Sequence, residues 1–100
     1  MNSTEKDKKM EVEIKNTKYI LEKNYRDCFD VDEFIDMYTE YFMPFDYIFG
    51  DYSYDKLRLK GFYNSDSIDF NDYNDINGLD DYINNYCAYG AKYFLLKKVK

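Results

Sequence analysis

Histidine is absent from the 100 residues of this chain. Without an imidazole, the protein cannot form the Ser-His and Cys-His pairs that activate nucleophiles, nor any histidine-based metal site. An enzyme built on this sequence would have to use carboxylates, lysine, tyrosine or a single thiol. We therefore rank a carboxylate-dependent or thiol-dependent enzyme last, name no catalytic residue, and expect no cofactor and no metal.

Cysteine is scarce as well, with Cys28 and Cys87 far apart and in no CxxC arrangement. This usage is typical of a cytosolic chain whose thiols stay reduced. Cys87 falls on an apolar helical stripe, which favours simple packing. Cys28 precedes a predicted helix whose N-terminus could activate a thiol, but no partner residue is evident and packing is again the preferred interpretation.

Long hydrophobic runs are also missing. No stretch approaches the ~18–20 apolar residues that a membrane-spanning helix needs. The start, MNSTEKDKKMEVE, has no apolar segment of the kind found in secretory signals. We expect a cytoplasmic protein with no membrane partner, in which residues 1–9 form a flexible polar leader.

Glycine occurs only four times and proline once. No glycine-rich run precedes a helix, so the sequence offers no phosphate-binding loop. Gly50, followed by Asp51, predicts a sharp exit from a strand, whereas Gly61 inside a strand predicts a bulge or the close approach of another chain. Pro44 cannot continue a helix and limits the helix before it.

Hydrophobic and aromatic residues are abundant, at 45% and 21% of the chain. A chain of this length and composition forms a single domain with one core, here residues 10–100. Hydrophobic spacing predicts five strands, two helices and the loops between them. The strands are 10–14, 18–22, 45–49, 57–63 and 92–99, the helices are 31–42 and a segment from an Asn77 cap to a Gly90 stop, and the longer loops are 50–56 and 64–75.

The resulting order, β-β-α-β-β-α-β, predicts a small α+β domain with a mostly antiparallel sheet covered by two helices. Asp30 has the spacing of a helix cap for the first helix. In the strand 57–63, Leu57 and Leu59 alternate with Arg58 and Lys60. Alternation of this kind places the leucines and the cations on opposite faces of the sheet.

Charge is distributed unevenly along this chain of net charge −6. Residues 27–55 hold nine acids and no lysine or arginine, and three cations, Lys56, Arg58 and Lys60, then fall within five positions. The loop 64–75 carries four evenly spaced aspartates, but it lacks the alternation, the glycine and the terminal glutamate of a calcium loop. We interpret it as a solvated acidic loop.

The three cations lie beside two tyrosines of the predicted turn. Aromatic rings flanked by cations can stack single-stranded bases, so the leading hypothesis is a binding module for RNA or a ribonucleoprotein that uses the hairpin 47–63. The candidate contacts are Asp51, Tyr52, Tyr54, Lys56, Arg58 and Lys60. A solvated charged face with tyrosines folded over a sheet edge stays open. The alternative function is a protein–protein interaction module, or a homodimer, that uses an exposed sheet edge.

Three stretches resemble a known family: "YRDCF", "FDYIFGDYSYDKLRLKGFY" and "LDDYINNYCAYGAKYFLLKKV". Over residues 25–63 and 76–99 the chain is similar to the YutD-like family, small cytosolic proteins of Gram-positive bacteria and their wall-less relatives. The family pattern has tryptophan and glycine where this chain has Tyr52 and Tyr54. If that tryptophan anchors a ligand, Tyr52 would stack on it less well. The resemblance implies a fold and a compartment, and carries over no catalytic residue.

Overall fold

The computed structural model describes residues 10–67, 74–87 and 90–99. The expected leader 1–9, and Asp69 and Asp72 of the expected acidic loop, lie outside the described residues. The elements in chain order are β1 (Glu11–Ile14), β2 (Thr17–Tyr25), α2 (Val31–Met37), η1 (Glu40–Phe42), β3 (Tyr47–Ser53), β4 (Lys56–Phe62), η2 (Ile76–Gly78), α3 (Leu79–Tyr86) and β5 (Tyr93–Lys98).

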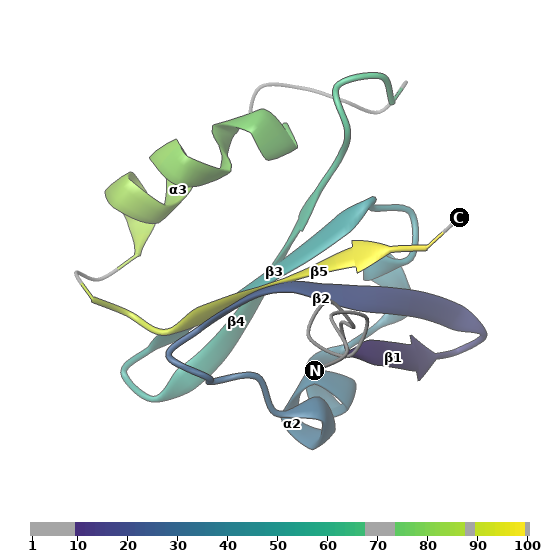
Figure 1. Ribbon diagram of the computed structural model, residues 1–100, viewed down its shortest axis with the longest axis horizontal. Helices are drawn as coiled ribbons and strands as arrows, with labels where there is room; N and C mark the ends of the chain where they lie inside the picture. The colour runs from purple at the N-terminus through teal and green to yellow at the C-terminus, as the bar shows by residue number, and fades with distance from the viewer. Residues whose placement is uncertain (1–9, 68–73, 88–89, 100) are drawn as a thin grey trace, which may run out of the picture.

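The strands form one sheet in the order β1-β2-β5-β3-β4, and every pair of neighbours runs antiparallel. The last strand, β5, therefore lies between β2 and β3, and α2 and α3 lie on opposite sides of the sheet (Figure 1). The predicted α+β class, element order and antiparallel sheet are confirmed.

Both faces of the sheet carry a core because each is covered by a helix. On the α2 face, Phe94 and Leu96 of β5 are fully buried together with Phe34 of α2. On the α3 face, Leu95 packs with Leu79 of α3. A strand buried on both faces reads as a continuous apolar run rather than an alternating one, and β5 does so.

The first helix is shorter than predicted. It begins at the Asp30 cap, whose carboxylate accepts the N–H groups of Asp32 and Glu33, but it ends at Met37 rather than Phe42. Tyr38 leaves the helix in an extended conformation, and its buried hydroxyl lies 2.9 Å from the hydroxyl of Tyr19 on β2. This tertiary contact replaces the helical continuation that the apolar spacing predicted.

The prediction for the second helix was wrong at both ends. Asn77 is not its cap, because residues 76–78 form a 3₁₀ turn that precedes α3. Asp75 caps this turn, and its side chain accepts a hydrogen bond from the Asn77 N–H at 3.0 Å. The helix α3 ends at Tyr86. Gly90, with φ of +73°, lies in the turn that leads into β5, where glycine adopts this backbone conformation without strain.

The central hairpin is longer and its loop tighter than expected. The strand predicted at 45–49 is β3 at 47–53, and only Tyr54 and Asp55, with φ of +53° and +65°, form the turn. Gly50 is therefore no strand exit. It lies inside β3 under the Phe94 ring, and an added Cβ would lie 2.2 Å from that ring. Gly61 lies inside β4, and the ring of Phe45, a residue of the same chain, occupies the space where its side chain would stand.

Candidate functional site

One edge of the sheet is long and unpaired. Among the residues that the structure describes, no strand pairs with the outer side of β4. Ser53 and Lys56 face each other across a two-residue turn, so they form a hydrogen-bonded pair and the pattern alternates from there. The N–H and C=O groups of Leu57, Leu59 and Gly61 consequently point away from β3.

This free edge has a defined end. At Tyr63, just beyond β4, the N–H donates to the Asn74 carbonyl at 2.6 Å and the carbonyl accepts from the Ile76 N–H at 3.0 Å. The result is an isolated parallel bridge between Tyr63 and Asp75. The chain itself thus occupies the outer side of the sheet at this point, and the open stretch is β4.

The two faces of β4 differ in chemistry, as the sequence predicts. Arg58 and Lys60 share the α3 face with their cross-strand neighbours Asp51 and Phe49. Leu57 is buried and Leu59 packs partly against the core on the α2 face. An edge of this kind offers backbone hydrogen bonds together with one cationic and one apolar row of side chains.

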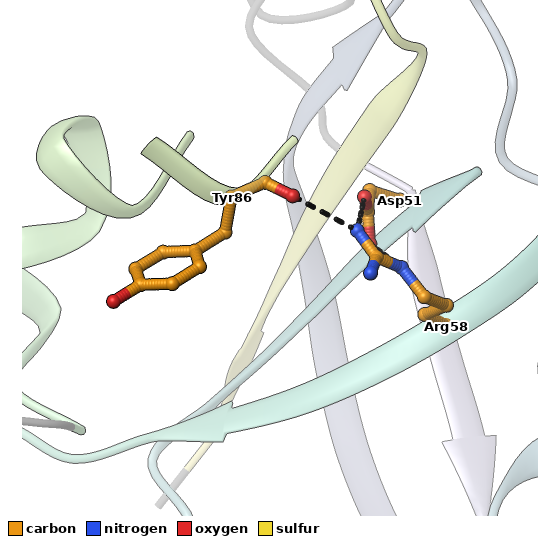
Figure 2. Close-up of polar contacts among 3 residues, drawn as sticks. All are labelled: Asp51, Arg58 and Tyr86. Carbon is orange, nitrogen blue, oxygen red and sulfur yellow. Dashed lines mark hydrogen bonds and ion pairs between the residues drawn. The ribbon is translucent and has the colours of Figure 1, made fainter. Parts of the chain in front are cut away.

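Asp51 holds Arg58 in place (Figure 2). The Asp51 side chain is almost fully buried and accepts from Arg58 Nε at 3.2 Å and from Nη2 at 2.5 Å. The same Nη2 donates to the backbone carbonyl of Tyr86 at 3.3 Å. The hydrogen bond from Asp51 raises the pKa of Arg58. Asp51 on β3 and Arg58 on β4 thus form an ion pair, and the bond from Arg58 to the Tyr86 carbonyl links this pair to the end of α3. A carboxylate buried without a charged partner would be strongly destabilising.

Both thiols contact the core, as expected. Cys87 packs in the α3-side cluster, where burial, followed by a hydrogen bond to Asp51, raises its pKa to about 12. Cys28 packs against the α2-side cluster, and burial raises its pKa too. Because the thiolate is the nucleophile, neither environment favours thiol chemistry.

Lys60 lies in a hollow between β4 and α3. Its ammonium is 5.1 Å from the ring centroid of Phe62 and 5.4 Å from that of Tyr82, and burial lowers its pKa. Tyr82 stacks on Tyr86 with ring centroids 5.2 Å apart. The hollow has a volume of about 310 Å³, and its lining includes Lys60, Phe62, Asp75, Asp81, Asn85 and Tyr86.

Tyr52 was expected in an exposed turn beside the cations, and the structure corrects this. It belongs to β3 and faces α2, where its hydroxyl donates to Glu33 Oε1 at 2.5 Å and lies 3.3 Å from the Cys28 carbonyl. The ammonium of Lys92 lies over its ring. The sheet therefore separates Tyr52 from Arg58 and Lys60.

The other predicted contact residues fall into two groups. Asp51, Arg58 and Lys60 lie together on the α3 face of the hairpin. Tyr54 is 96% exposed in the turn, and Lys56 is exposed next to it at the start of β4. The sequence does not predict Tyr82 and Tyr86 of α3 as neighbours of these residues, because nothing in their spacing shows that α3 covers this hairpin.

No helix in the described part of the chain is long and apolar enough to cross a membrane. Within residues 10–67, 74–87 and 90–99, no group of three or more Cys, Asp or Glu side chains could hold a metal ion.

Comparison with known proteins identifies the family. A family model described as "Putative antitoxin YutD-like" matches residues 13–97. The protein "Putative antitoxin YutD" of Bacillus subtilis (strain 168) is 37% identical over 87 residues, covering 87% of this chain and 96% of that protein. The solution NMR structure of protein yutD from B. subtilis superposes with a TM-score of 0.77 at 33% identity, covering 100% of this chain and 92% of that one. The chain belongs to the YutD-like family.

Proposed function

We propose that this protein is a cytoplasmic protein-binding module that takes up an extended segment of a partner protein along the outer side of β4. The observation that carries the proposal is the row of outward backbone groups at Leu57, Leu59 and Gly61, which no described strand pairs. Such a row is a template for strand addition, in which main-chain hydrogen bonds supply affinity and alternate side chains supply specificity.

The relatives support a protein partner. The similar B. subtilis protein is named "Putative antitoxin YutD", and an antitoxin acts on a toxin. We assign the same role to this chain. The partner protein that contributes the added strand is then a toxin that this module inhibits by binding. No catalytic group is needed for this activity, because binding alone carries it.

The RNA hypothesis for the hairpin 47–63 draws less support from the geometry. Arg58 is bound to Asp51 and Lys60 lies over two rings, while Tyr52 is hydrogen-bonded on the opposite face. The remaining contacts, Tyr54 and Lys56, offer one ring and one cation. In a chain of net charge −6, this is little to hold a phosphate backbone.

The test is site-specific crosslinking in cells. A photoreactive amino acid placed at Lys56, on the open edge, should capture a discrete protein, and the product should survive ribonuclease. The matched control is the same residue at Lys18, which is exposed but paired with Glu13 at the far end of the sheet. Equal capture at the two positions, or a product that ribonuclease removes, would contradict strand addition and in the second case restore the RNA hypothesis.

A further inference from the structure

We infer that the strand added to β4 carries carboxylate side chains on its α3-facing side, and that Lys60, with the hollow beside it, is the binding site for one of them. This inference rests on the proposed function, and it names the chemistry of the partner. It follows from the direction of the β4 side chains, the state of their charges and the position of the hollow.

An added strand would continue both faces of the sheet. Its side chains on the α3 face would stand opposite Lys56, Arg58 and Lys60, with Cβ atoms about 4.5–5.5 Å apart. The hollow is lined by β4 and by residues 75–86, and no residue of β3 or β5 contributes to it. It therefore lies at the open side of β4, where a side chain of the added strand would enter.

Two of the three cations have no counter-charge among the residues that the structure describes. Arg58 is neutralised by Asp51, but neither Lys56 nor Lys60 forms an ion pair with any described residue. The ammonium group of Lys60 is also partly desolvated by burial, and this desolvation lowers its pKa. A carboxylate placed beside a partly desolvated ammonium restores the interaction that burial removed.

Two acids, Asp75 and Asp81, also line the hollow, but their positions leave Lys60 available to a carboxylate of the added strand. Asp75 accepts from the Ser65 hydroxyl and the Asn77 N–H, each at 3.0 Å. Asp81 is exposed in the first turn of α3, where the helix dipole favours an acid. Neither is paired with Lys60, and Asn85 adds an amide that can donate to an incoming carboxylate.

The same cations oppose a homodimer through this edge. If a second copy paired antiparallel with β4 and continued both faces, cations would stand opposite cations across the junction. Like charges directly opposite each other are destabilising, and lysines on an edge strand are a known means of preventing self-association. Charge complementarity thus favours an acidic strand of a different protein.

The other face completes the description of the partner. Leu57 and Leu59 stand on the α2 face of β4, and the facing positions of the added strand would bury apolar side chains against them. We therefore expect a segment in which acidic and apolar residues alternate.

The experiment uses three synthetic extended peptides that share valine at alternate positions and carry Glu, Ser or Lys between them. By fluorescence polarisation at low salt, the Glu peptide should bind about tenfold more tightly than the Ser peptide, and the Lys peptide more weakly than both. Lys60→Met should remove most of the preference for Glu. Lys18→Met, which changes an exposed lysine paired with Glu13, should leave it intact.

Hydrogen exchange on the same complexes separates the inference from the proposed function. Strand addition should protect the amides of Leu57, Leu59 and Gly61, whichever peptide is bound. Protection with equal affinity for Glu and Ser would overturn the charge inference and leave strand addition standing. A preference for Glu without protection would overturn strand addition, and an absence of binding by all three peptides would overturn both.

Discussion

At the scale of single residues, the pair formed by Asp51 and Arg58 is asymmetric. The Asp51 side chain is 2% exposed, whereas that of Arg58 is 46% exposed. Removing the arginine would leave a carboxylate in the core without a charged partner. Removing the charge of the aspartate would leave a guanidinium that can still reach water.

We accordingly expect Arg58→Met to lower the free energy of unfolding by about 3 kcal/mol, as breaking a buried ion pair does when the buried partner remains. Asp51→Asn should cost clearly less. Urea unfolding followed by circular dichroism measures both. A larger loss for Asp51→Asn would show that the hydrogen bonds from Cys87 and Arg58 to the carboxylate matter more than its charge.

The Cys87 thiol predicts a dependence of stability on pH. Its pKa rises from 9.0 to about 12 on folding, so the neutral thiol is the form that the folded state prefers. The resulting stabilisation is complete below about pH 9 and is lost as pH rises towards 12. Wild type should therefore lose stability more steeply over this range than Cys87→Ala. Parallel unfolding curves for the two proteins would contradict this assignment.

At the scale of elements, periodicity predicted both α-helices and all five strands, but neither the two 3₁₀ helices nor the residues at which several elements end. The bounds of α2 and β3 depend on contacts between distant residues. Tyr38 leaves the helix where it meets Tyr19, and Gly50 continues a strand because the Phe94 ring fills the space of its missing side chain. Neither partner can be identified from local spacing, which is why the sequence predicts a strand end at Gly50.

Gly50→Ala tests this interpretation of the hairpin. The added methyl group would lie 2.2 Å from the fully buried ring of Phe94, and overpacking of this kind costs about 1–3 kcal/mol. The matched control is Gly78→Ala, because nothing lies within 4 Å of that position, so that the added methyl group causes no overpacking there. Equal melting temperatures for the two variants would mean that the Phe94 ring of β5 does not cover Gly50.

At the scale of the whole molecule, the strand order decides which candidate site exists. The alternation of Leu57 to Lys60 was visible in the sequence, and so were the cations. That β4 lies at the edge was not, because this depends on β5 entering the sheet between β2 and β3. For the same reason, the expected cluster of Tyr52 with Arg58 and Lys60 is divided between two faces of the sheet.

Charge reversal provides a test at this scale. A Lys56→Glu, Lys60→Glu double variant should remain monomeric alone, since its edges repel as those of wild type do. A mixture of variant and wild type should form a heterodimer, because two β4 edges can then pair with opposite charges facing. Sedimentation velocity measures the species at several salt concentrations, and high salt should weaken the complex. Dimerisation of wild type alone through β4 would contradict the role assigned to the lysines.

The bridge between Tyr63 and Asp75 has a consequence for selectivity by length. It closes the outer side of the sheet at one end of β4, while the turn at Tyr54 and Asp55 ends the strand at the other. The seven residues between them span roughly 23 Å at the usual rise of a strand. In the proposed strand addition, a partner segment can therefore pair with β4 only between the turn and the bridge. A longer segment would have to bend away from the sheet at the bridge.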